Sequence, residues 1–126
     1  MKDEKKKLFV MRNLVHLFEQ SIFELKREKY YEIIAFDSSY ELSKQIIEVD
    51  PDLIVLDSGD PAYPGMKMAL KLKQASPTKP IPIVLLHEAE ELEQLRAEHN
   101  VFNQYLLKPV DPYLLQLTID HLLFKA

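Results

Sequence analysis

The feature that most constrains this chain is a short apolar run, residues 53–56, that ends directly in the carboxylate of Asp57. An uninterrupted apolar run of this length is typical of a strand that is buried on both faces of a parallel sheet. In open α/β sheets, functional groups collect at the carboxyl ends of the strands, where the connecting loops diverge. Asp57 is therefore the first candidate functional residue.

The rest of the chain repeats this alternation of short apolar runs and amphipathic segments. The pattern predicts strands at residues 8–11, 31–36, 53–56, 83–86 and 104–107. Helical spacing of apolar residues predicts helices over 14–25, 38–49, 65–75, 88–99 and 112–123. Strand–helix units in this order predict an α/β fold: a single doubly wound five-stranded parallel sheet in the flavodoxin-like order 2-1-3-4-5, with helices on both faces.

Local signals support two of the predicted helix starts. Ser38 with Glu41 three residues later resembles a capping box. Asp111 predicts an N-cap, and Pro112 fits the first helical position because its missing N–H costs nothing there. The helix that follows carries leucines on more than one face, which is typical of a helix that contacts a partner as well as its own core.

Length and composition bound the class of protein. The chain has 126 residues, of which 47% are hydrophobic and 29% charged, and this predicts one domain over residues 7–126 behind a flexible charged tail at 1–6. The net charge of -4 argues against nucleic acid or an anionic membrane as the main partner. The absence of cysteine excludes disulfides and thiolate sites. Because the first residues form no apolar core and no run approaches membrane-spanning length, we expect a cytoplasmic protein.

Two motifs together resemble the receiver domain of response regulators (CheY-like). Asp57 stands at a strand end and is followed by a proline and then a glycine at intervals of four residues, as in the family's phosphoacceptor loop. Lys108 and Pro109 follow the last predicted strand, with Tyr105 just ahead, and resemble the family's lysine–proline motif and its switch aromatic. The resemblance covers nearly the whole chain, and the combination is far more specific than either motif alone.

The resemblance implies a signalling module rather than an enzyme. Members of the family accept a phosphoryl group on one aspartate, from a histidine kinase or a small phosphodonor, with Mg²⁺ as cofactor. Asp57 would be the phosphoacceptor and a metal ligand, Lys108 would contact the phosphoryl oxygens, and the carbonyl of Gly59 would be a second metal ligand. Tyr105 would change rotamer with the signalling state. The Lys108–Pro109 peptide bond would be cis, an isomer that costs little before proline.

Two positions depart from the family pattern. Arg12 and Asn13 replace the acidic pair that ends the first strand and holds Mg²⁺, and His87 replaces the Ser or Thr that ends the fourth. We expect the Arg12 guanidinium to bind the Asp57 carboxylate through two hydrogen bonds, in place of the metal. With Asn13 as the other side-chain ligand, we expect Mg²⁺ binding to be weak or absent. His87 offers one hydrogen bond but would crowd a phosphoryl group.

These departures favour a pseudo-receiver, a receiver-type module of a two-component phosphorelay system that binds proteins without being phosphorylated. The alternative is a genuine phospho-accepting receiver with weak Mg²⁺ dependence. The partners we expect are a histidine kinase or another signalling protein, and a second copy of the chain through the face made by the fourth helix, the fifth strand and the fifth helix.

A nucleotide- or flavin-binding enzyme is a third class of function for a doubly wound sheet. The chain has only two glycines and no glycine-rich phosphate loop, which argues against this class. Whether the chain acts alone as an adaptor or belongs to a longer protein stays open at this point.

Overall fold

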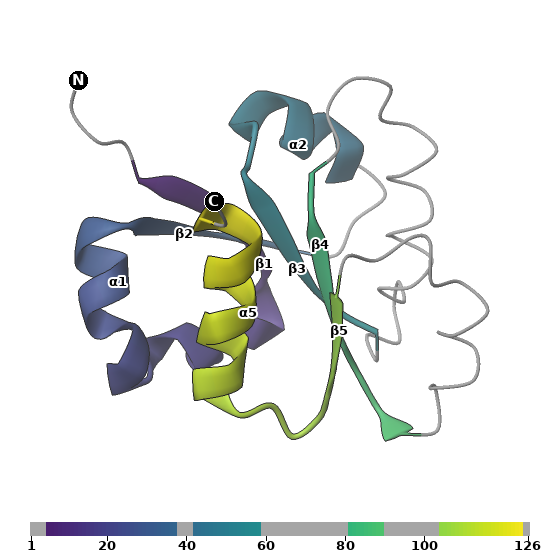
Figure 1. The fold of residues 1–126 in the computed structure, drawn as a ribbon. Helices are drawn as coiled ribbons and strands as arrows, with labels where there is room; N and C mark the ends of the chain where they lie inside the picture. Colours follow the sequence, from purple (N-terminus) through teal and green to yellow (C-terminus); the bar gives the residue numbers. More distant parts are fainter. Residues whose placement is uncertain (1–4, 38–41, 59–80, 90–103, 125–126) are drawn as a thin grey trace.

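The computed structural model describes residues 5–37, 42–58, 81–89 and 104–124, which form one five-stranded sheet with helices packed against it (Figure 1). The strands are β1 (Lys6–Met11), β2 (Tyr31–Phe36), β3 (Leu53–Asp57), β4 (Ile83–His87) and β5 (Gln104–Leu107). Their order is β2-β1-β3-β4-β5, and every neighbouring pair is parallel. The predicted fold class and strand order are confirmed.

The described helical segments are η1 (Arg12–Glu19), η2 (Ser21–Phe23), α1 (Glu24–Lys29), α2 (Leu42–Val49) and α5 (Pro112–Phe124). The crossovers from β1 to β2 and from β2 to β3 run in opposite directions across the sheet, so right-handed connections place α1 and α2 on opposite faces. Helix α5 lies beside α1, where Tyr30 meets Phe124 edge-on (Figure 1). No helix among the described residues is long and apolar enough to cross a membrane.

The first predicted helix, over 14–25, is wrong as one continuous α-helix. It consists of two 3-10 segments separated by Gln20, whose backbone is extended (φ -68°, ψ 149°), and it becomes α-helical only from Glu24. In a continuous α-helix, five residues turn the chain by about 500°, which would point Phe23 about 140° away from Phe18. The extended residue corrects this phase, because both rings are buried and their centroids lie 4.8 Å apart.

The core lies against the three central strands. β3 and β4 are buried along their whole length, and β1 is buried from Leu8 onward. Full burial explains why these strands appear in the sequence as continuous apolar runs, since both faces of the sheet are covered. β3 and β4 also extend one residue beyond the predicted ends, so Asp57 and His87 are themselves strand residues. β1 begins at Lys6, inside the segment predicted as a tail, because Lys6 pairs with Tyr31.

Helix α5 begins and packs as predicted. The backbone N–H of Tyr113 donates to Asp111 Oδ1 at 3.1 Å, which caps the helix behind Pro112. Its inner side is buried in the core, whereas Leu114 and Leu117 on other sides are about half exposed. The helices predicted over 65–75 and 88–99, and the capping box at Ser38 and Glu41, lie outside the described residues.

Candidate functional site

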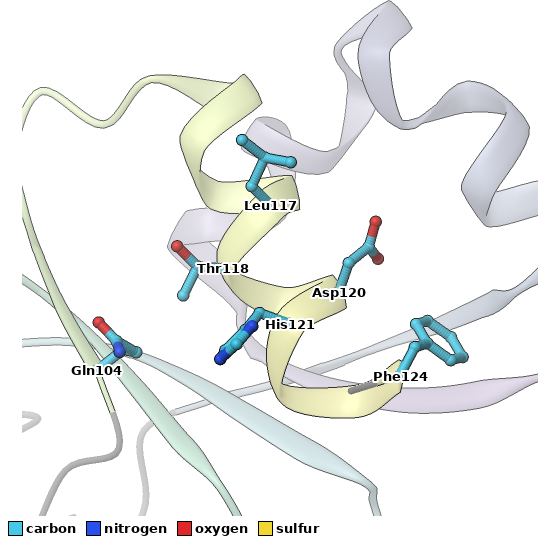
Figure 2. Close-up of a pocket in the computed structure, with 6 residues that line it drawn as sticks. All are labelled: Gln104, Leu117, Thr118, Asp120, His121 and Phe124. Atoms are coloured by element: carbon cyan, nitrogen blue, oxygen red, sulfur yellow. The ribbon is translucent and has the colours of Figure 1, made fainter. Parts of the chain in front are cut away.

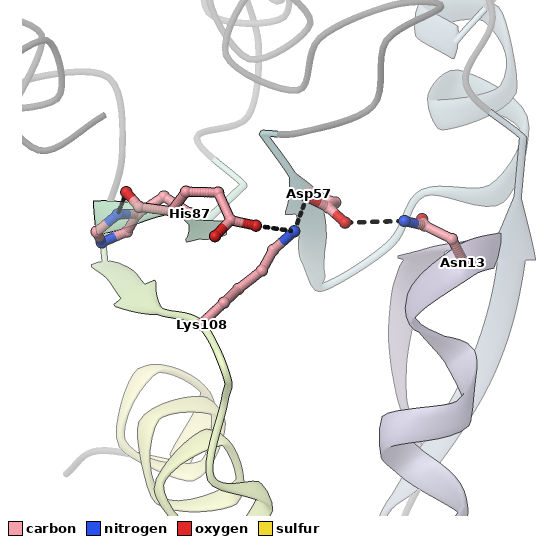
Figure 3. A network of polar contacts seen from close by, with 5 residues as sticks. Asn13, Asp57, His87 and Lys108 are labelled. Atoms are coloured by element: carbon pink, nitrogen blue, oxygen red, sulfur yellow. Dashed lines mark hydrogen bonds and ion pairs between the residues drawn. The ribbon is translucent and has the colours of Figure 1, made fainter. Parts of the chain in front are cut away.

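The candidate site is built around Asp57, whose side chain is only 8% exposed at the end of β3. Each of its carboxylate oxygens accepts a hydrogen bond from the chain. Lys108 Nζ donates to Oδ1 at 2.6 Å, and Asn13 Nδ2 donates to Oδ2 at 2.8 Å (Figure 3). The structure therefore brings Lys108 and Asn13 to Asp57, while contact of Lys108 with a phosphoryl group and metal ligation by Asn13 stay predictions.

Strand geometry explains why these distant residues meet. Asn13 lies in the first turn after β1, and Lys108 follows β5 directly. The carboxyl ends of parallel strands share one edge of the sheet, so residues that follow different strands converge there. The backbone N–H of Lys108 also donates to the carbonyl of His87 at 2.8 Å, which fixes the start of the β5–α5 connection. The Lys108–Pro109 peptide bond is cis, as predicted.

A second carboxylate holds Lys108 from another side. Glu88 Oε2 lies 3.5 Å from Lys108 Nζ, and its side chain is about half exposed. Burial lowers the pKa of Lys108, but the hydrogen bonds and charges of Asp57 and Glu88 outweigh it, so the pKa lies above its usual value. Sequence reasoning missed Glu88 at this site. The available signal was its place directly after a strand that ends at the same sheet edge.

The predicted contact between Arg12 and Asp57 is not formed. Arg12 Nε instead donates to Asp37 Oδ1 at 2.7 Å, and both of these side chains are mostly exposed. The cause is the register between β1 and β2, in which Met11 pairs with Phe36. The next residue of each strand is then Arg12 and Asp37, so the guanidinium meets the nearer carboxylate. Asp57 with Arg12 and Lys108 would have given the site a formal charge of +1, whereas Asp57 and Glu88 with Lys108 give it a formal charge of -1.

His87 and Tyr105 form a neighbouring pair. Their rings meet edge-on with centroids 5.6 Å apart, and His87 is buried at the end of β4. His87 Nδ1 lies 2.8 Å from the carbonyl oxygen of Glu88, and the ring points away from Asp57 (Figure 3). The hydrogen bond expected from His87 to a phosphoryl group, and the rotamer switch of Tyr105, stay predictions.

The residues present fit Mg²⁺ poorly. Asp57 is the one carboxylate among the predicted ligands, Asn13 turns its N–H group toward it, and Gly59 lies outside the described residues. Within the described ranges, no group of three or more His, Cys, Asp or Glu side chains could hold a metal ion. Mg²⁺ demands near-octahedral coordination by hard oxygen ligands. An amide whose N–H groups face the carboxylate does not provide it.

A cleft of about 400 Å³ opens beside Asp57. We call it the Asp57 cleft. Its polar lining comes from Asp57, Lys108, Asn13 and His16. Its apolar lining comes from Leu14, Leu17, Leu86, Pro109 and Val110. The cleft therefore lies between η1 on one side and the β5–α5 connection on the other.

A second hollow, of about 560 Å³, lies between the start of β5 and the second half of α5 (Figure 2). It is lined by Gln104, Leu117, Thr118, Asp120, His121 and Phe124. The carboxylate of Asp120 is engaged elsewhere, because it accepts a hydrogen bond from the Tyr31 hydroxyl and pairs with Lys26 Nζ at 3.1 Å. None of the site residues predicted from the sequence lines this hollow.

Comparison with curated proteins finds similarity to one type of regulator, while no protein-family model matches the chain. The chain is 29% identical over 108 residues to the phosphate regulon transcriptional regulatory protein PhoB of Escherichia coli K12, covering 85% of this chain and 47% of PhoB. It is 30% identical over 83 residues to PhoB of Pseudomonas aeruginosa, covering 65% of this chain and 36% of that protein. The chain thus spans about half, or less, of the length of these relatives.

Solved structures of response regulators are similar to this chain over 95% of its length. A putative response regulator from Chloroflexus aurantiacus superposes with a TM-score of 0.75 at 25% identity, covering 95% of this chain and 98% of that one. A response regulator from Desulfuromonas acetoxidans gives a TM-score of 0.71 at 25% identity, with 95% and 97% covered.

Proposed function

Because this chain is a receiver domain of the response-regulator type, we propose that it is a signal-transduction module of a two-component system that works without phosphorylation of Asp57. Two hydrogen bonds support this proposal, because Lys108 and Asn13 each donate to one oxygen of the Asp57 carboxylate. The chain would then be a pseudo-receiver, a domain that presents a binding surface.

The chemistry of phosphoryl transfer supports this proposal. Transfer requires a positioned nucleophile and neutralisation of the charge on the phosphoryl oxygens, which metal ions usually provide. Asn13 is neutral, so it contributes no charge that would hold a dication beside Asp57. Lys108 already neutralises the carboxylate through a charge-assisted hydrogen bond of 2.6 Å. The described residues therefore favour a fixed ion pair over a loaded metal site.

A protein-binding role is supported by the outer side of β5 and α5. Four large apolar side chains there are about half exposed: Leu107, Tyr113, Leu114 and Leu117. Tyr113, Leu114 and Leu117 lie within two turns of one helix, and neighbouring exposed apolar residues of this kind are typical of interaction surfaces. We propose another signalling protein or a second copy of the chain as the partner. Residues 90–103, which include the predicted fourth helix, lie outside the described residues.

Intact mass after incubation with acetyl phosphate and Mg²⁺ tests the proposal. We expect no adduct of one phosphoryl group on the unchanged chain. Asp57→Asn is the matched control, because it keeps the shape of the side chain and removes the nucleophile. An adduct that forms on the unchanged chain and disappears in Asp57→Asn would contradict a phosphorylation-independent role.

A phospho-accepting receiver with weak Mg²⁺ dependence is the second candidate function. It is favoured by the open cleft beside Asp57 and by the lysine ammonium already at the carboxylate. An adduct that forms slowly and requires high Mg²⁺ concentrations is the result expected for this candidate. A histidine kinase would then be the expected phosphodonor.

A further inference from the structure

We propose that the Asp57 cleft binds a small molecule that has an apolar body and one carboxylate group. This inference goes beyond the proposed function, because it holds whether or not Asp57 accepts a phosphoryl group. It is derived from the shape of the cleft and from the hydrogen-bond donors at its polar end.

The size and lining of the cleft suit a small ligand. Its volume of about 400 Å³ lies within the range of roughly 300 to 1,000 Å³ typical of small-molecule sites. Leu14 and Leu17 come from η1, and Pro109 and Val110 come from the opposite wall. Leu86 pairs with Asp57 across β3 and β4, so its side chain lies on the same face of the sheet and at the same end of the cleft.

The donors at the polar end identify the charge of the ligand. A lysine ammonium has three N–H groups, and the contacts of Lys108 with Asp57 and Glu88 use two of them. The Asn13 amide has two N–H groups, and its contact with Asp57 uses one. Counted over the part of the chain that the structure describes, one N–H group on each residue therefore remains for an acceptor on the ligand.

A carboxylate fits these donors better than a cation does. Asp57 and Lys108 are the oppositely charged lining residues of the cleft and neutralise each other, while Glu88 lies outside the lining, so an incoming cation would gain little there and would face the ammonium group. Glu88 is a weak competitor for Lys108, because its side chain is half exposed and its oxygen lies 3.5 Å from Nζ. A ligand carboxylate can accept hydrogen bonds from the remaining N–H groups of Lys108 and Asn13 and displace Glu88 from Lys108, while the apolar body of the ligand fills the cleft.

Phenylacetate is a suitable probe, with phenylacetamide and phenethylamine as matched neutral and cationic analogues. Binding to the ¹⁵N-labelled full chain is followed by backbone amide shifts. We expect saturable shifts at the cleft residues with a Kd of about a millimolar or tighter. We expect the amide to bind about tenfold more weakly, because it loses charge-assisted hydrogen bonds, and the amine not to bind.

Two variants that fill the cleft locate the site. Val110→Phe, and independently Leu17→Phe, should abolish phenylacetate binding, and an unchanged spectrum elsewhere shows that each variant is folded. Ile47→Phe, on the exposed side of α2 and outside the cleft, should leave binding unchanged. Absence of saturable shifts in the unchanged chain, equal binding of the three probes, or full binding to both folded cleft variants would overturn the proposal.

Discussion

Two carboxylates that are largely shielded from solvent, each paired with a lysine, lie at opposite ends of the sheet. Asp57 stands at the carboxyl end of β3 and pairs with Lys108 at 2.6 Å. Asp120 on α5 pairs with Lys26 at 3.1 Å and accepts a hydrogen bond from Tyr31, the first residue of β2. The Asp57 side chain is 8% exposed and the Asp120 side chain 25% exposed.

The two networks differ in what surrounds them. The partners of Asp120 lie on α1 and β2, so this network joins two helices, α1 and α5, to the edge strand of the sheet. The partners of Asp57 lie in the turns after β1 and β5, beside an open cleft. A lysine–carboxylate pair is therefore no sign of function by itself. The position at the carboxyl ends of the strands and the adjoining cleft distinguish the Asp57 network.

The largest effect on stability is expected from removing Lys108, the lysine that pairs with Asp57. Lys108→Met removes the cation from Asp57, whose nearly buried carboxylate keeps its hydrogen bond from Asn13. Because a nearly buried charge then lacks its counter-charge, the variant should lower the free energy of unfolding by about 2–3 kcal/mol. The value is below that of a fully buried pair because Lys108 itself is 24% exposed. Urea denaturation measures it. A loss under about 1 kcal/mol would mean that Asp57 is better solvated than its burial indicates.

Tyr31→Phe tests the Asp120 network and should cost about 1–2 kcal/mol, because Asp120 loses its hydroxyl donor. Burial, and then Asp120, raise the pKa of Tyr31 above its ordinary value of 10.0. The phenol therefore keeps its proton in the folded chain while the unfolded chain loses it. Its contribution to stability is complete below about pH 10 and falls as the pH rises further.

The decrease of the free energy of unfolding at alkaline pH tests this contribution of Tyr31 directly. Unfolding free energies measured from about pH 8 to about pH 11 should fall less steeply for Tyr31→Phe than for the unchanged chain. Some slope should remain, because the raised pKa of Lys108 acts in the same direction above its ordinary value of 10.5. Identical slopes in the two proteins would contradict the assignment to Tyr31.

Lys26→Met should have a smaller effect than its counterpart Lys108→Met, about 1 kcal/mol. Asp120 keeps the Tyr31 hydroxyl and is partly solvated, so little charge is left unpaired. The variant also loses the contact of Lys26 Nζ with the Tyr30 ring, at 5.0 Å from its centroid. Lys44→Met, at an exposed position on α2, is the matched control. Equal losses for Lys26→Met and Lys108→Met would remove the distinction between the networks.

The smallest effect is expected for Glu88→Gln, within about 0.5 kcal/mol. Its oxygen lies 3.5 Å from Lys108 Nζ and its side chain is half exposed, so water screens the pair. Thermal unfolding of the variant beside the unchanged chain measures the change. A loss above about 1 kcal/mol would place Glu88 among the main supports of the site rather than at its rim.

The sequence predicted the strands well because their burial on both faces leaves continuous apolar runs. Asp57, Lys108 and Asn13 could be placed in one site through the resemblance to receiver domains, and they meet because each lies at or just after the end of a strand at one edge of the sheet. The pairing of Arg12 with Asp37 could not be predicted, since it depends on the register of β1 and β2. The break at Gln20 was missed because the apolar spacing around it fits a helix until the burial of Phe23 is known.

Restoring the acidic pair tests the central claim most directly. Arg12→Asp combined with Asn13→Asp would place carboxylates at the two positions where the family holds Mg²⁺. Intact mass after acetyl phosphate and Mg²⁺ treatment is compared with that of the unchanged chain, and Asp57→Asn in the same background is the control. We predict an adduct on Asp57 only in the double variant. An adduct on the unchanged chain at the same rate and Mg²⁺ concentration would contradict the claim that Asn13 and Lys108 hold Asp57 in a phosphorylation-independent site.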